Sequence, residues 1–182
     1  MTTALDYIQT LSKAYAKGDA TEHTHRAALQ MLIEAAGKQI EATNEPKAAQ
    51  RENKPDYVVR KAGALVGFVE AKDIGVDLKA TLKTPQLKRY VEALPNLILT
   101  NYVDFVWLVR GANGTETRME VSLGVPHGVV GSKTIQAAAD AQARWDELIR
   151  SFLNEVTPLV DTPKLLAQTL GGQTRLLRDL VE

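Results

Sequence analysis

Two carboxylates and a lysine in this chain stand at a spacing that could bind a metal ion beside a phosphate. Asp56 follows Pro55, and Glu70 and Lys72 stand 14 and 16 residues after Asp56, in the sequence Glu-Ala-Lys. All three adjoin apolar stretches, where an ionised group is costly to bury unless a partner compensates its charge. A divalent cation with a phosphate would compensate it. The pattern Pro-Asp…Glu-x-Lys therefore predicts a metal-dependent nuclease site.

A β-hairpin should bring these groups together. Residues 57–60 and 65–71 are rich in β-branched and aromatic residues, which predicts two strands joined by a short turn at Gly63. A turn centred on Gly63 places Asp56 opposite Glu70, and cross-strand neighbours lie roughly 5–8 Å apart. We therefore expect both carboxylates to reach one cation.

The residue types suit hydrolysis of a phosphodiester by a metal-activated water. Mg²⁺ prefers oxygen ligands and keeps several waters, so Asp56 and Glu70 would bind it, and Mn²⁺ should substitute. Lys72 is two residues from Glu70 and shares its strand face, so it would orient the water or stabilise the transition-state charge. Pro-Asp alone and Glu-x-Lys alone are also common at ordinary strand ends. The prediction therefore depends on the two occurring together.

Composition is typical of one soluble domain. The chain has 182 residues, no cysteine, and 22 basic against 22 acidic residues. It therefore has no disulfide framework or zinc–thiolate site, and its zero net charge argues against a large nonspecific nucleic-acid surface. We find no export signal and no apolar run of the ~18 residues that a membrane span needs. We expect a cytoplasmic protein without membrane contact, in which a local basic groove is still possible.

The remaining pattern predicts helices around a central sheet. We expect helices over residues 4–17, 22–38, 84–94, 134–155 and 163–182. Further strands are expected over residues 97–100, 105–109 and 116–122. Residues 41–54 predict a flexible polar connection, and residues 73–83 a loop. The second helix should bury Leu29, Leu32, Ile33 and Ala36. This order predicts an α/β fold, a mixed central β-sheet flanked by helices on both faces.

The hairpin and the order of elements resemble the PD-(D/E)xK nuclease superfamily, whose core is restriction-endonuclease-like. Gln86 and Tyr90, in the helix after the Glu-x-Lys strand, are similar to the Gln-x-x-x-Tyr motif of RecB-like members. They are four residues apart on one helix face, and the resemblance implies that they position a DNA phosphate. The stripe between them, Leu87, Val91 and Leu94, should pack on the sheet.

Basic residues gather beside the predicted site. We expect them to contact the DNA backbone, although a solvated charged face is the ordinary alternative. They are Lys79, Lys83, Lys88 and Arg89.

A closer likeness spans roughly residues 20 to 110. It rests on residues 21–26, 55–59, 67–75, 86–90 and 96–102, which resemble the N-terminal nuclease domain of type ISP and type IIG-like restriction-modification enzymes. In those single-chain proteins the nuclease is fused to helicase or translocase and N6-adenine methyltransferase domains. The resemblance implies an endodeoxyribonuclease domain over residues 1–160 that cuts double-stranded DNA. Residues 161–182 would form a helix that connects to a following domain.

The resemblance also implies a third metal ligand from an early helix. Glu22 is the candidate and Glu34 the runner-up, although the helix dipole alone favours a glutamate in the first turn. Two other functions stay open: a standalone DNA repair or recombination nuclease, and a non-catalytic DNA-binding domain. We expect packing or surface roles for His23, His25 and His127, and core or interface positions for Trp107 and Trp145.

Overall fold

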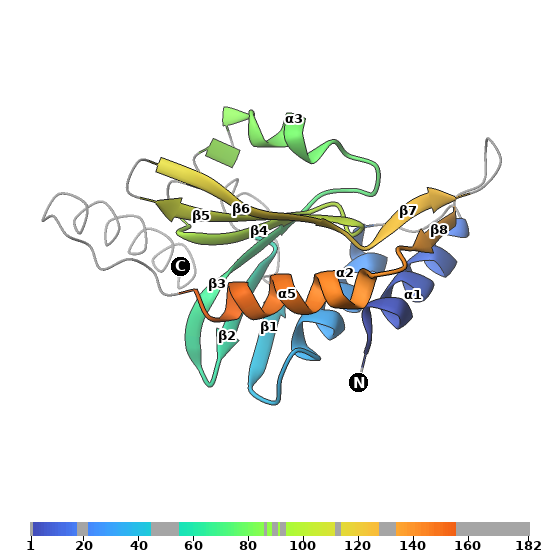
Figure 1. The fold of residues 1–182 in the computed structure, drawn as a ribbon, viewed down its shortest axis with the longest axis horizontal. Helices are drawn as coiled ribbons and strands as arrows, with labels where there is room; N and C mark the ends of the chain where they lie inside the picture. The colour runs from blue at the N-terminus through green and yellow to red at the C-terminus, as the bar shows by residue number, and fades with distance from the viewer. Residues whose placement is uncertain are drawn as a thin grey trace, which may run out of the picture.

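A six-stranded mixed sheet forms the centre of the protein (Figure 1). The computed structural model describes residues 2–17, 22–44, 55–85, 87–88, 91, 94–111, 114–127 and 134–155. The helices are α1 (Ala4–Ala16), α2 (Glu22–Glu34), α3 (Leu78–Leu82) and α5 (Ala141–Leu153). The strands of the sheet are β1 (Ile40–Asn44), β2 (Tyr57–Lys61), β3 (Ala64–Ala71), β4 (Asn96–Thr100), β5 (Asp104–Gly111) and β6 (Gly114–Ser122). A separate two-stranded ribbon pairs β7 (Gly124–His127) with β8 (Thr134–Ala137).

The strands follow one another across the sheet in chain order, from β1 to β6. Neighbouring strands are antiparallel, except that β3 and β4 are parallel. Parallel neighbours need a long crossover, which here contains α3 and a second helical stretch that begins at Pro85. Thr84 caps this stretch, because its Oγ1 accepts a hydrogen bond from the N–H of Leu87 at 3.3 Å.

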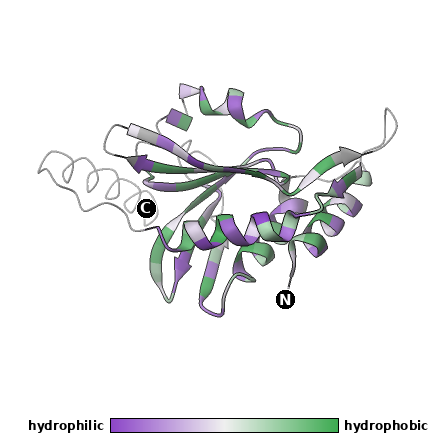
Figure 2. Ribbon diagram, viewed as in Figure 1, coloured by the Kyte–Doolittle hydropathy of each residue, from purple (hydrophilic) through white to green (hydrophobic). Residues whose placement is uncertain are grey.

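Helices cover both faces of the sheet, as expected. Along β5, Phe105, Trp107 and Val109 pack with α1, α2 and α5, whereas Val106 and Leu108 pack on the opposite face. Figure 2 shows hydrophobic residues along the central strands and mixed hydropathy on α1 and α5. The second face is covered by Leu78, Leu87, Val91 and Leu94, and Trp145 of α5 is buried on the first. The predictions of an α/β sandwich, of buried tryptophans and of the Leu87–Val91–Leu94 stripe are confirmed.

The predicted connection over residues 41–54 is wrong at its start, where the chain forms β1. Ile40 and Ala42 are buried and Glu41 and Thr43 are exposed, the alternation of a strand with one covered face. This strand pairs with β2 through Ala42 and Val59. Residues 45–54 lie outside the described residues.

Two predicted helices are too long. The second ends at Glu34, and Ala36 is exposed in the turn that follows, although Leu29, Leu32 and Ile33 are buried as expected. Residues 134–137 are strand β8, and the helix begins only at Ala141. The β8 strand is anchored to α1, because Ser12 Oγ accepts a hydrogen bond from the N–H of Ile135 at 3.0 Å.

The predicted loop over residues 73–83 contains α3. Asp77 caps this short helix by accepting hydrogen bonds from the N–H groups of Lys79 and Ala80. The predicted helix over residues 163–182 lies outside the described residues. Among the helices that the structure describes, none is long and apolar enough to span a membrane.

Candidate active site

The β2–β3 hairpin has the predicted register at its site end. Tyr57 is paired with Val69, so the next position along places Asp56 beside Glu70. The turn itself is not centred on Gly63 alone, since both Ala62 and Gly63 have positive φ, of 52° and 78°. That two-residue turn pairs Lys61 with Ala64.

A β-bulge explains why the site has the predicted register although the turn differs from the predicted one. The register shifts by one residue between Val59 and Arg60, where Arg60 is paired with Leu65 and Val59 with Gly67. Val66 is therefore the extra residue on β3. Beyond the bulge, the pairing is the one that a turn centred on Gly63 would have produced.

Asp56 is buried and fixed by two donors. Its Oδ1 lies 2.5 Å from Nη2 of Arg26, and the two side chains are only 10% and 4% exposed. Its Oδ2 accepts a hydrogen bond of 2.9 Å from the backbone N–H of Ala71. Charge-assisted hydrogen bonds of this kind favour the ionised carboxylate. The carboxylate therefore lies in a defined orientation at the end of β3.

Glu70 and Lys72 form a second ion pair at the same end of the hairpin. Lys72 Nζ donates to Glu70 Oε1 at 2.6 Å, and the lysine side chain is 27% exposed against 6% for the glutamate. The backbone N–H of Lys72 donates to the carbonyl of Thr100 at 2.7 Å, which extends the parallel β3–β4 pairing past Ala71. The expected convergence of Asp56, Glu70 and Lys72 is present in the structure.

Glu70 has an unsatisfied oxygen. Its Oε2 is buried and accepts no hydrogen bond within the described residues. Burial raises the pKa of Glu70 to about 7, and the neighbouring negative charge of Asp56 acts in the same direction. The charge and hydrogen bond of Lys72 oppose this rise in pKa without cancelling it. A buried carboxylate with a raised pKa and a free oxygen is a frequent sign of a functional site.

These groups suit a hard divalent cation. Mg²⁺ commonly binds through one or two carboxylates and keeps its remaining waters, and the unsatisfied Oε2 of Glu70 beside Asp56 offers such ligands. In the described residues there is no group of three or more His, Cys, Asp or Glu that could hold a metal. Glu22 is the first residue of α2, but its side chain lies outside what the structure describes.

Glu34 belongs to a different part of the fold. Its Oε1 accepts hydrogen bonds from Gln30 Nε2 at 3.0 Å and from the N–H of Ala42 at 3.1 Å. The carboxylate thus joins α2 to the edge strand β1.

The predicted DNA-contacting residues are only partly described. Lys83 and Lys88 are exposed, as a role at a DNA backbone would require. Lys79 is also exposed and lies 3.4 Å from the carboxylate of Glu120 on β6. Gln86, Arg89 and Tyr90 lie outside the described residues, so their predicted roles stay predictions.

Arg26 was not predicted as a site residue. It is buried on α2, in line with Leu29 and Ile33, three and seven residues further on. A charged residue on the buried stripe of a helix requires a buried partner, and this was the signal in the sequence. Its neighbour His25 is buried against Tyr102, with ring centroids 5.3 Å apart, which agrees with the packing role expected of it.

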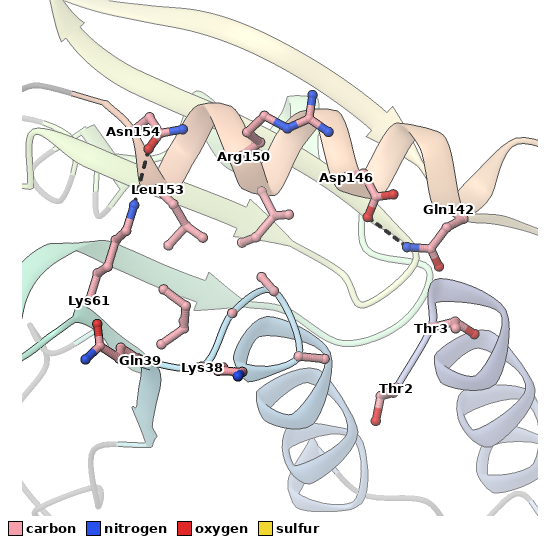
Figure 3. A pocket seen from close by; sticks show the side chains of 15 residues that line it. Thr2, Thr3, Lys38, Gln39, Lys61, Gln142, Asp146, Arg150, Leu153 and Asn154 are labelled. Atoms are coloured by element: carbon pink, nitrogen blue, oxygen red, sulfur yellow. Dashed lines mark hydrogen bonds between the residues drawn. The ribbon is translucent and has the colours of Figure 1, made fainter.

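A separate cavity of about 730 Å³ lies between α5, the α2–β1 turn and the N-terminal segment (Figure 3). Lys61, at the turn of the hairpin, donates to Asn154 Oδ1 across its rim at 3.3 Å. Among the described residues that line it, Asp146 is the one carboxylate, and it accepts a hydrogen bond from Gln142 at 2.8 Å. The cavity thus lacks the paired carboxylates found at the other end of the hairpin.

Comparison with known proteins yields a structural likeness. No protein-family model and no curated protein matches the chain. The cryo-electron-microscopy structure of a DrdV–DNA complex is similar to it, with a TM-score of 0.57 and 17% identity over 85% of this chain. The chain spans only 14% of the length of that DrdV chain. At this identity the likeness concerns the fold, a six-stranded mixed sheet flanked by helices, consistent with a restriction-endonuclease-like fold.

Proposed function

We propose that this chain is a Mg²⁺-dependent endodeoxyribonuclease domain of the PD-(D/E)xK type, acting within restriction-modification machinery. The observation that carries the proposal is the buried Glu70 carboxylate, with its unsatisfied Oε2, beside Asp56 and Lys72. Without a cation, the buried Oε2 of Glu70 has no hydrogen-bond partner among the described residues, which costs stability. Metal binding would compensate that cost.

The site residues have distinct tasks in this proposal. Asp56 and Glu70 bind the metal, and Glu22 is proposed as a further ligand. The bound metal supplies a water of lowered pKa and offsets negative charge on the phosphate. Lys72 reaches the site from a partly exposed position, where its ammonium orients that water or contacts a phosphate oxygen.

The proposed substrate is double-stranded DNA. Support comes from the fold shared with a protein whose structure contains DNA, and from the exposed lysines Lys83 and Lys88 near the crossover. We propose that these lysines contact the DNA backbone together with Gln86, Arg89 and Tyr90. We also propose that this nuclease unit works with helicase or translocase and N6-adenine methyltransferase domains in the cytoplasm. The match to 14% of a much longer chain supports only that such a fold can be one part of a larger protein.

Plasmid cleavage tests the proposal. Supercoiled DNA is incubated with the wild-type chain in Mg²⁺ or Mn²⁺, and with the variants Asp56→Asn and Lys72→Ala. Cutting should require metal and be lost in both variants. Asp146→Asn and Lys61→Ala are the matched controls, because they remove the same groups near the Figure 3 cavity. Cutting that survives both site substitutions would rule out the mechanism.

Calorimetry tests the metal site directly. Mn²⁺ should bind the wild-type chain and the Asp146→Asn control, and should bind Asp56→Asn far more weakly. Equal Mn²⁺ affinity of wild type and Asp56→Asn would show that Asp56 is not a ligand.

A further inference from the structure

Arg26 joins three elements around Asp56. Its guanidinium contacts Asp56 through Nη2 at 2.5 Å and Asn44 Oδ1 through Nη1 at 3.3 Å. Its own carbonyl accepts a hydrogen bond from the hydroxyl of Tyr57 at 2.9 Å. A guanidinium that is 4% exposed is costly to bury and needs a compensating charge. In this structure Asp56 provides that charge.

The charges of the described site are already balanced. Arg26 is paired with Asp56, and Lys72 with Glu70. A divalent cation added to this buried set would bring two positive charges, of which the proposed ligand Glu22 would offset one, and low-dielectric surroundings penalise the excess. This excess favours the displacement of one resident cation when the metal binds.

Lys72 and Arg26 differ in which carboxylate oxygens they leave available to a metal ion. Lys72 holds Oε1 of Glu70 and leaves Oε2 without a partner, so the metal can reach Glu70 without displacing it. At Asp56, Oδ2 is held by the backbone N–H of Ala71, which is fixed in β3. Oδ1 is held by Arg26, whose side chain can change rotamer. The guanidinium is therefore the group that stands where a metal would approach Asp56.

We propose that Arg26 is a positioning residue that substitutes for the metal at Asp56 in the metal-free protein. Metal and guanidinium compete for Asp56 Oδ1, so metal binding releases Arg26 from this ion pair. The ion pair keeps Asp56 oriented before the metal arrives, and the competition lowers the affinity of the site for the metal. This inference rests on the proposed metal site but concerns a residue outside its ligand set.

Mn²⁺ affinity of Arg26 variants tests the competition. Calorimetry compares the wild type with Arg26→Gln, which keeps a hydrogen-bond donor and removes the charge, and with Arg26→Lys, which keeps the charge. We expect about tenfold tighter Mn²⁺ binding in Arg26→Gln, because a unit charge close to the ion is removed, and near wild-type affinity in Arg26→Lys. The control is Arg144→Gln, since Arg144 forms an exposed pair with Asp140 at 2.8 Å and its loss changes net charge equally.

Thermal unfolding supplies a second comparison. Without metal, Arg26→Gln should unfold at a lower temperature than wild type, because Asp56 loses its counter-ion. Saturating Mn²⁺ should raise its unfolding temperature more than that of wild type. A purely structural Arg26 would lower both temperatures by the same amount, and that result would overturn the proposal.

A measurement on the wild-type chain avoids the variants. In ¹⁵N spectra of arginine side chains, titration with diamagnetic Mg²⁺ should shift and sharpen the Arg26 guanidinium signals as the ion pair opens. Unchanged Arg26 signals at saturating Mg²⁺ would overturn the competition. Equal or weaker Mn²⁺ binding by Arg26→Gln would overturn it while leaving the metal site intact. Failure of the wild type and of every variant to bind Mn²⁺ would overturn the metal site, and with it this inference.

Discussion

The backbone N–H of Ala71 donates a hydrogen bond of 2.9 Å to Oδ2 of Asp56. This contact joins the residue that precedes β2 to the last residue of β3. It orients the Asp56 carboxylate through the main chain, which side-chain substitutions leave in place. The separation of the two carboxylates is thus fixed by the hairpin before any ligand binds.

Asp56→Asn should destabilise the protein as well as inactivate it. The substitution leaves the guanidinium of Arg26 buried without its counter-ion, and breaking a buried pair in this way costs about 3–5 kcal/mol. Urea titration of the metal-free protein measures the loss of unfolding free energy. Asp140→Asn, which breaks the exposed pair with Arg144, should cost less than about 1 kcal/mol. Similar costs for the two variants would contradict the buried pair.

The contribution of Glu70 to the stability of the metal-free protein should fall as the pH rises from about 4.5 to about 7. The pKa of Glu70 is raised from 4.5 to about 7 in the folded state, so over that range the folded protein binds more protons than the unfolded chain. The contribution of Glu70 to the unfolding free energy therefore decreases with pH, by about 3 kcal/mol in all. The decrease levels off above the pKa of Glu70 in the folded protein. Denaturation at a series of pH values measures it.

The variant Glu70→Gln isolates the contribution of Glu70 to the pH dependence of stability. Because the amide does not titrate, the variant should lack the decrease in unfolding free energy that Glu70 causes between pH 4.5 and pH 7. An identical pH dependence in wild type and Glu70→Gln would show that Glu70 titrates normally.

Asn96→Ala should be strongly destabilising, although Asn96 is far from any proposed chemistry. Its Oδ1 accepts from Trp107 Nε1 at 2.7 Å, and its Nδ2 donates to the carbonyls of Val66 and Phe152 at 3.0 and 3.1 Å. Alanine leaves the buried indole N–H of Trp107 without this partner and removes one hydrogen bond from each carbonyl, so we expect a loss of about 2–4 kcal/mol in urea denaturation. Asn154→Ala removes an exposed amide and should change stability little. A small effect at Asn96 would contradict its bridging role.

Gly67→Ala tests the packing of α5 on β3. A methyl group at Gly67 would lie 2.6 Å from the carbonyl oxygen of Asn96 and 2.8 Å from the ring of Phe152. Overpacking of this kind costs about 1–3 kcal/mol, and it should appear as a lower urea midpoint with an unchanged slope. An unchanged midpoint would mean that both α5 and the β4 backbone at Asn96 can shift to accommodate the methyl group.

The hairpin could be predicted because local patterns determine it. Glu70 and Lys72 share a strand face through the two-residue period, and Pro55 with Asp56 marks the strand entry. The pairing of Asp56 with Glu70 was predicted from a turn centred on Gly63. The observed turn differs, and the same pairing arises because a bulge opposite Val59 shifts the register by one residue. Such compensation depends on tertiary packing that no single strand reveals.

The missed features depend on partners distant in the chain. Only Ile40 and Ala42 mark β1 as a strand with a buried face, within a stretch that is otherwise polar. β8 is four residues long and is stabilised by β7 and Ser12. Arg26 finds its counter-ion 30 residues later. Short polar strands and buried ion pairs carry little local signal, so they are the features that sequence patterns predict least well.

The bulge between Val59 and Arg60 also determines which changes of length the hairpin can accept. Deletion of Val66 would remove the bulge and leave Asp56 opposite Glu70, because Arg60 would stay paired with Leu65 and Val59 with Gly67. Substitutions along the hairpin leave this frame intact, whereas a single-residue deletion or insertion between the turn and Tyr57 would separate the two carboxylates. Relatives that keep the site should therefore vary in the composition of this hairpin and remain constant in the number of residues between its turn and Tyr57.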